Sequence, residues 1–227
     1  MMIKIFCLLA FTILILKIDN PEKHQVKTIT LSKENPVIIN GKIEADWKEA
    51  SVFEMTNGGK VCFKYDGTYL YVGIQGIKEG WNQVYLAEGE SSDVSVIHAS
   101  AALARTFYKQ DATKKWQPSN PFLAELRDKS ITDETKRKMD DYLSKNNWVA
   151  NNIYMGNRNG VEFKLKPKNG SNKMFHINVI WVSDSLNPSF FPDTLDDDSR
   201  INQKLVEGWM PGDVNFNMNQ WAVINLK

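Results

Sequence analysis

Apolar and polar positions alternate along much of the chain from residue 37 onward, which predicts β-strands. The clearest case is KVCFKYDGTYLYVGIQG, residues 60–76, where two β-rich runs flank the turn dipeptide Asp66-Gly67. On the second run the even-numbered positions 70–74 are apolar, so we expect them to face the core. The opposite face carries Tyr69 and Tyr71, and we expect it to be solvated or to meet a partner.

The same alternation, bounded by turn residues, predicts further strands along the chain. They cover residues 83–87, 94–99, 101–108, 122–127, 153–155, 161–165, 175–182 and 221–226. Residues 37–50 carry strand, turn and short-helix signals, with Trp47 expected to face the core. Residues 184–213 are rich in Asp, Asn and Pro and are expected to form a long loop region.

One substantial helix is predicted over residues 132–145, with Thr132 as its N-cap and acidic residues in its first turn. Its apolar positions are few, namely Met139, Tyr142 and Leu143, so we expect it on the surface, packed over an end of the strands. Short strands, one helix and no βαβ alternation favour an all-β fold. We predict an antiparallel β-sandwich, jelly-roll-like with immunoglobulin-like layering, and one surface helix near residues 132–145.

The N-terminus has the pattern of an export signal. Lys4 precedes an apolar run over residues 5–16, which is the length of a signal-peptide core and short for a membrane span. We therefore predict a signal peptide over 1–18, a tether over 19–30 and a single ligand-binding domain over 31–227. An uncleaved N-terminal anchor is the alternative, and either places the domain outside the cytoplasm, in the periplasm or secreted.

Composition agrees with one soluble globular domain, because 42% of residues are hydrophobic and 24% are charged. The formal net charge of +1 gives no basic excess for nucleic acid. The sequence holds two cysteines, and Cys7 lies in the predicted signal. Cys62 therefore has no partner for an internal disulfide, and its place in a strand-like run indicates a buried structural thiol.

Two segments resemble family 9 carbohydrate-binding modules and related DOMON-like sandwiches. The first is INGKIEADWKEA, residues 39–50, and the second is the hairpin at 60–76. The order of these two segments and the distance between them along the chain also match those of the family. The positions that carry the resemblance are Gly41, Asp46, Trp47, Ala50, Tyr65, Asp66, Leu70, Tyr71 and Val72.

The resemblance implies two packed antiparallel sheets and an extracytoplasmic ligand-binding module without catalysis. Members of this family bind sugars, often on paired tryptophans and often with a structural calcium ion, whereas DOMON relatives bind haem. The chain departs from the pattern at DVSVIHASAALA, residues 93–104, which lacks the acidic residues that close the corresponding strand. GVEFKLKP, residues 160–167, is only weakly similar to a later segment of the family's sequence pattern.

Aromatic side chains are the main candidates for ligand binding, since sugars stack their C–H faces on flat rings. Of seven tryptophans, Trp47 and Trp181 are assigned to the core. His98 precedes a run of small residues and is a candidate ligand donor, haem ligand or core group, while Arg127 suits a ligand carboxylate or hydroxyl. Loop anchoring and an ordinary surface ion pair are the structural alternatives. The candidate ligand-binding residues are Trp81, Trp116, Trp148, Trp209, Arg127 and His98.

An acidic run, DTLDDDSR at residues 193–200, offers the oxygen ligands that Ca²⁺ prefers. It lacks the spacing of an EF-hand, so a solvated loop is the favoured interpretation. Asp193, Asp196, Asp197 and Asp198 are the candidate ligands.

These observations favour an exported, non-catalytic module that binds a carbohydrate through loop aromatics and polar side chains. No nucleophile motif indicates an enzyme, and no cofactor is expected beyond that calcium ion. The alternatives are a DOMON-type haem-binding domain, for which His98 is the first axial candidate, and a module that binds a protein partner in an envelope complex. We expect no nucleic-acid partner and no membrane contact beyond the signal peptide or N-terminal anchor.

Overall fold

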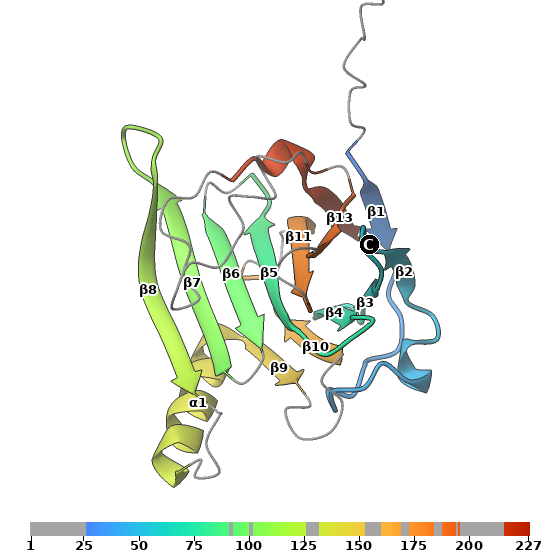
Figure 1. Cartoon of the computed structure of the whole chain (residues 1–227), viewed down its shortest axis with the longest axis horizontal. Helices are drawn as coiled ribbons and strands as arrows, with labels where there is room; N and C mark the ends of the chain where they lie inside the picture. Colours follow the sequence, from blue (N-terminus) through green and yellow to red (C-terminus); the bar gives the residue numbers. More distant parts are fainter. Residues whose placement is uncertain are drawn as a thin grey trace, which may run out of the picture.

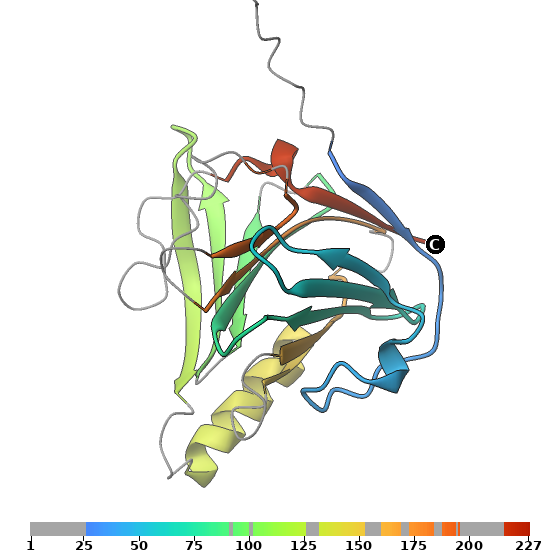
Figure 2. The same ribbon diagram turned by 45° about the vertical axis from the view of Figure 1, so that its right-hand side comes forward.

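A computed structural model describes residues 26–90, 93–99, 102–125, 132–152, 160–168, 173–183, 188–193, 195 and 216–227 of the chain. These residues form two β-sheets that pack face to face, with one α-helix along one side (Figures 1 and 2). The predicted all-β sandwich with a single helix is therefore confirmed for the described part of the chain.

The larger sheet has eight strands among the described residues, in the order β1-β13-β11-β5-β6-β7-β8, with β12 paired to β11. Its neighbours are antiparallel except β1 and β13, which are parallel. The strands are β1 (Thr28–Leu31), β5 (Trp81–Glu88), β6 (Val94–Ala99), β7 (Ala102–Gln110), β8 (Trp116–Glu125), β11 (Met174–Val182), β12 (Ser189–Phe191) and β13 (Ala222–Leu226).

The smaller sheet has five strands in the described chain, in the order β2-β3-β4-β10-β9, and all its pairs are antiparallel. Strands β3 and β4 form the predicted hairpin around Asp66-Gly67. The strands are β2 (Ser51–Glu54), β3 (Lys60–Tyr65), β4 (Leu70–Gln75), β9 (Trp148–Asn152) and β10 (Gly160–Leu165).

The main core lies between the two sheets and follows the strand alternation that the sequence shows. Leu70, Val72 and Ile74 of β4 are fully buried in it, as predicted. Trp181 of β11 packs against the glycine at position 76, where an added Cβ would lie only 2.1 Å from the indole Nε1. Close packing of the indole therefore requires glycine at this position.

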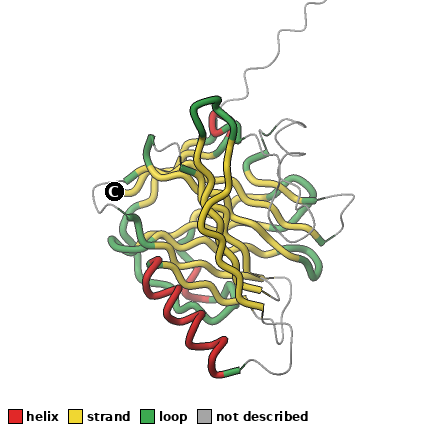
Figure 3. The backbone as a smooth tube through the Cα atoms, turned by 90° about the vertical axis from the view of Figure 1, so that its left-hand side faces the viewer, coloured by secondary structure: helices red, strands yellow, loops and turns green. Residues whose placement is uncertain are grey.

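The helix α1 (Asp133–Asn146) contacts β8 and β9, and Figure 3 shows it at the lower edge of the sandwich, oblique to the strands. The Thr132 hydroxyl accepts a hydrogen bond from the backbone N–H of Thr135, as a helix N-cap does. The predicted apolar positions Met139, Tyr142 and Leu143 pack against the main core. No residue of α1 is fully buried, which agrees with the predicted surface helix.

Residues 37–50 cover the outer face of the smaller sheet. A short 3-10 helix, η1 (Ala45–Trp47), places the Trp47 ring on Gly73 of β4, where an added Cβ would lie 2.9 Å from the ring. Glu162 of β10 holds this segment: its carboxylate accepts hydrogen bonds from Trp47 Nε1 at 2.7 Å, from the Asn40 N–H at 2.8 Å and from the Gly41 N–H.

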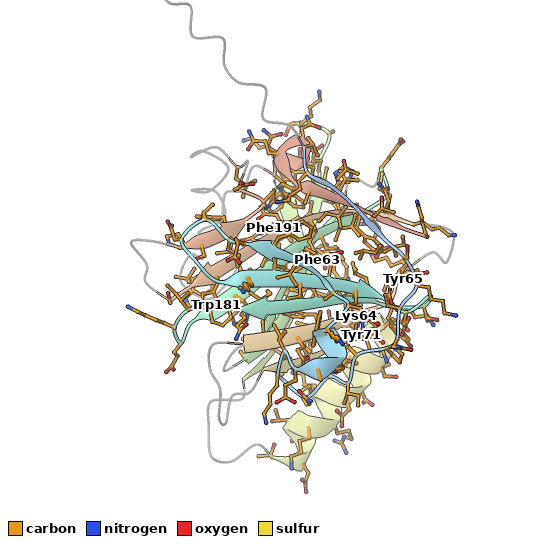
Figure 4. All side chains as sticks on the ribbon, turned by 90° about the vertical axis from the view of Figure 1, so that its right-hand side faces the viewer. Phe63, Lys64, Tyr65, Tyr71, Trp181 and Phe191 are labelled. Carbon is orange, nitrogen blue, oxygen red and sulfur yellow. The ribbon has the colours of Figure 1, made fainter. Side chains whose placement is uncertain are left out.

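The tyrosine face of the hairpin is consequently covered by the chain itself. Tyr71 has no exposed surface, and its hydroxyl donates to Asp66 at 2.6 Å. Lys64, which is paired with Tyr71 in the register, donates from Nζ to the carbonyl oxygen of Asp46 at 2.8 Å (Figure 4). The solvated or partner-binding face predicted from the sequence is therefore a small second core, which also includes Trp47 and Cys62.

Several elements differ from the prediction. Strand β1 overlaps the end of the predicted tether and pairs with β13, so the sheet includes residues before 31. Strands β2 and β12 were not predicted, and β8 begins at Trp116 and runs through Pro118 and Pro121. Proline is tolerated there because β8 is the edge strand of its sheet.

The predicted strand at 153–155 and the predicted signal peptide lie outside the described residues. Among the helices that the structure does describe, none has the length and apolar character needed to cross a membrane.

The Glu162 contacts predict a specific loss of stability. We expect Glu162→Ala to lower the free energy of unfolding by about 2–4 kcal/mol, because it leaves buried N–H donors of Trp47 and Gly41 without an acceptor. Urea unfolding measures this change. Glu54→Ala is the matched control, since Glu54 is exposed on β2 and should cost less than about 0.5 kcal/mol. Equal effects of the two substitutions would show that Glu162 does not hold the segment.

Candidate functional site: the outer face of the larger sheet

The outer face of the larger sheet carries a cluster of aromatic side chains, which we call the aromatic cluster. Phe216 lies at its centre, and its ring centroid is 5.0–5.9 Å from the four other rings, all in edge-to-face contact. Every member is buried. The aromatic cluster consists of Tyr85, Tyr108, Trp116, Phe216 and Trp221.

Polar side chains without hydrogen-bond partners lie on the same face. Asn178 of β11 pairs with Tyr85 of β5, Tyr85 pairs with Val96 of β6, and Val96 pairs with Thr106 of β7. These residues therefore form one row across four strands. Neither side-chain atom of the wholly buried Asn178 has a partner, and the same holds for the Thr106 hydroxyl.

The indole N–H groups of Trp116 and Trp221 in the aromatic cluster are also without acceptors. Buried polar groups in native proteins nearly always have a hydrogen-bond partner. The unpaired amide, hydroxyl and indole N–H groups on this face therefore need an explanation. A ligand or ordered water that both donates and accepts hydrogen bonds satisfies that need.

The end of this face that lies away from the aromatic cluster is accessible to solvent. Trp81, at the start of β5, is only half-buried, and its ring centroid is 6.4 Å from that of His98 on β6. Beyond His98, the register leads to Ala104 of β7 and then to Leu123 of β8, which is 36% exposed. An aromatic ring, an imidazole and an exposed apolar side chain thus lie at the rim of the face.

The structure brings together only part of the predicted site. Trp81 and His98 are neighbours, and Trp116 lies on the same face at its far end. Trp148 was predicted to lie in a loop, but it opens β9 and its ring is buried in the main core, where it offers no face to a ligand. Trp81 and Trp116 likewise open strands and do not sit in loops.

The remaining candidates fall mostly outside the described residues, namely Trp209, Arg127, Asp196, Asp197 and Asp198. Asp193 is described and exposed. Among the described side chains, no group of three or more His, Cys, Asp or Glu residues is placed to hold a metal ion.

His98 gives no support to the haem-binding alternative. Its Nδ1 lies 2.5 Å from the carbonyl oxygen of Asn82, and its ring packs beside Trp81. The imidazole is buried in these contacts and makes a further interaction. This arrangement fits a histidine that supports the Trp81 ring.

Sequence reasoning missed Asn178, Thr106 and Tyr85. One signal was available: Asn178 is a polar residue inside the apolar run MFHINVIWV, at a position that alternates with core residues. A lone amide in such a run either completes a buried network or contacts a ligand. The sequence does not indicate which strands lie beside it.

Comparisons with known proteins add little to this description. No protein-family model matches the chain, and no curated protein matches it. Among solved structures, the chain is similar to "A carbohydrate binding module family 9 (CBM9) from Caldicellulosiruptor kristjanssonii in complex with cellotriose", at 12% sequence identity and a TM-score of 0.47. The match covers 88% of this chain and 94% of that chain. A similarity at this level assigns neither ligand nor activity.

The exposure of Trp81 predicts its accessibility in solution. We expect Trp81→Phe to remove more of the acrylamide-quenchable tryptophan emission than Trp148→Phe, because the Trp148 ring is buried between the sheets. Stern–Volmer quenching of the two variants measures the difference. Equal loss of quenchable emission would show that Trp81 is not the more accessible ring of the two.

The buried thiol gives a pH-dependent prediction. Burial raises the pKa of Cys62 from 9.0 to about 11, because the thiolate loses hydration. The unfolded chain therefore releases this proton first, and stability should fall as pH rises from about 9 to 11.

At pH 8 we expect a thiol reagent to label Cys62 only after unfolding, judged against Cys62→Ala. Rapid labelling of the folded protein would contradict the burial.

Proposed function

We propose that this protein is an exported, non-catalytic module that binds a carbohydrate on the outer face of its larger sheet. The ligand meets the protein at Trp81, the accessible end of the face, and extends toward Asn178. The residues that we assign to binding are Trp81, His98, Asn178 and the aromatic cluster.

The chemistry of the face supports a ligand with both apolar C–H surfaces and hydroxyl groups. The half-buried Trp81 indole offers a flat ring for stacking, and His98 packs beside it. Stacking on such a ring gives affinity, and a few convergent polar groups give orientation. A sugar ring presents both kinds of surface.

The single observation that carries the proposal is Asn178. Its amide is wholly buried, lies beside Tyr85, and has neither a donor nor an acceptor for its two polar atoms. An amide both donates and accepts, and a sugar hydroxyl does the same. A ligand hydroxyl is therefore a suitable partner for both atoms.

The spacing along β5 indicates the length of the ligand. Trp81 and Tyr85 lie four residues apart on one strand, which corresponds to about 13 Å. Asn178 is paired with Tyr85, so the accessible ring and the buried amide are separated by a similar distance along the sheet. A ligand that contacts both is a short oligosaccharide and not a single sugar.

The strands that carry the proposed ligand site present no carboxylate on this face. Glycoside hydrolysis ordinarily needs two carboxyl groups that flank the scissile bond. The described side chains that β5, β6 and β11 present on this face include no Asp or Glu.

Substitutions at Trp81 and Asn178 test the proposal. Against a panel of soluble oligosaccharides, we expect one saturable binder in isothermal titration calorimetry. Trp81→Ala should weaken binding of that ligand by up to about tenfold, because stacking on an aromatic ring contributes about 0.5–1.5 kcal/mol. Asn178→Ala should also weaken binding of this ligand, because the ligand hydroxyl loses both polar atoms of the amide as hydrogen-bond partners.

Val52→Ala is the matched control, since Val52 is exposed on the smaller sheet and should leave affinity unchanged. The unfolding midpoint of each variant separates loss of binding from loss of fold. A saturable ligand whose affinity is unchanged in folded Trp81→Ala would place the site elsewhere on the protein, and a panel without any binder would refute the proposed function.

A further inference from the structure

Arg105 of β7 is a buried cation on the inner face of the larger sheet, and the proposed glycan site makes no use of it. The residue is only 5% exposed. Its Nε donates to the Ser95 hydroxyl at 2.7 Å, and one Nη donates to the backbone carbonyl oxygen of Asn146 at 3.4 Å. A guanidinium has five N–H donors, so these two bonds use only part of its capacity.

Among the residues that the structure describes, no carboxylate pairs with this charge directly. Within the described parts of the chain, no Asp or Glu oxygen lies within 4.0 Å of Arg105. Glu88 of β5 is the nearby acid: its carboxylate attracts both Arg105 and Lys168 without a direct ion pair, and it accepts from the backbone N–H of Lys168 at 2.9 Å. Buried charges in proteins are ordinarily paired, so an unpaired buried arginine indicates a missing anion.

A second cation lies beside the first. The guanidinium carbon of Arg105 is 4.5 Å from the centre of the Phe107 ring, and Nζ of Lys168 is 4.7 Å from the same centre. Phe107 is half-buried and Lys168 is exposed, so the group reaches the surface. The Phe107 ring is therefore in contact with two positive charges, one buried and one at the rim.

An independent donor faces the same region. Tyr142 of α1 has a buried hydroxyl with no hydrogen-bond partner, and its ring stacks on Phe122 at 3.6 Å. Phe122 is the register partner of Arg105. The positive charge of Arg105 lowers the pKa of the Tyr142 hydroxyl, although burial raises that pKa by more. An unsatisfied hydroxyl thus lies near the Arg105 guanidinium, which itself contacts the C-terminal residue of α1.

We infer that Arg105 and Lys168 form a binding site for a small oxyanion, between the inner face of the larger sheet and the C-terminal end of α1. The planar guanidinium binds two oxygens of a carboxylate, sulfate or phosphate, and the lysine adds charge at the rim. The Tyr142 hydroxyl donates to the same anion. This inference does not depend on the proposed glycan site, because that site lies on the other face of the sheet.

The purely structural alternative is that Arg105 only neutralises the negative end of the helix through Asn146. Under that alternative the exposed Lys168 is irrelevant, and no added anion binds. The two accounts therefore differ at a residue whose substitution leaves the fold intact.

The test uses the whole protein and three probe anions, namely sulfate, phosphate and glucuronate, with glucose as the neutral control. Ionic strength is held constant with chloride. Binding is followed by the Nε–Hε resonance of Arg105 in NMR, assigned with Arg105→Lys. Lys168→Glu is compared with Lys166→Glu, because Lys166 is exposed in the same segment but does not contact Phe107.

We expect at least one anion to shift the Arg105 resonance saturably. Lys168→Glu should lower the affinity for that anion about tenfold, and Lys166→Glu should change the affinity less than twofold. A preference for glucuronate identifies the ligand as a carboxylate, whereas a preference for sulfate or phosphate identifies a tetrahedral anion. Absence of saturation by every probe, or equal weakening by the two lysine substitutions, would overturn the inference.

Discussion

The unequal width of the two sheets is the constraint on which the rest of this structure depends. In the described chain the larger sheet has eight strands and the smaller has five, so the smaller sheet cannot cover the whole inner face of its partner. Helix α1 fills the remaining side, with Tyr142 on Phe122 and also in edge contact with Trp148. On the inner face of this part of the larger sheet, Arg105 contacts the C-terminal residue of α1 and the Phe107 ring. An apolar core cannot accommodate these groups without partners, and this is why we place an anion there.

The outer faces of the two sheets are covered in different ways, and the difference separates structure from function. On the smaller sheet, residues 37–50 form a closed set of contacts in which Glu162, Trp47 and Tyr71 all have partners. On the larger sheet, the aromatic cluster packs tightly, yet Asn178 and Thr106 beside it have no partner. A satisfied polar network stabilises a fold, whereas an unsatisfied one needs an explanation, and our proposal supplies it with a ligand.

The sequence predicted local elements well and distant relations poorly. The hairpin at β3–β4, the strand Val94–Ala99 and the capped helix follow from alternation, turn chemistry and capping, all of which act over a few residues. Strand β1 was missed because its partner β13 lies at the other end of the chain. Of the predicted site residues, Trp81 and His98 are neighbours, whereas Trp148 lies in the core. Asn178 was not predicted, because the sequence does not show which strands lie beside it.

The most direct test of the central claim is to map the contact surface of an oligosaccharide by amide chemical-shift perturbation in NMR. The account predicts that a ligand found by titration perturbs β5, β6 and β11, from Trp81 to Asn178, and leaves η1 and the outer face of the smaller sheet unchanged. Perturbations confined to the smaller sheet or to α1 would contradict it, because they would show that the ligand binds away from the outer face of the larger sheet.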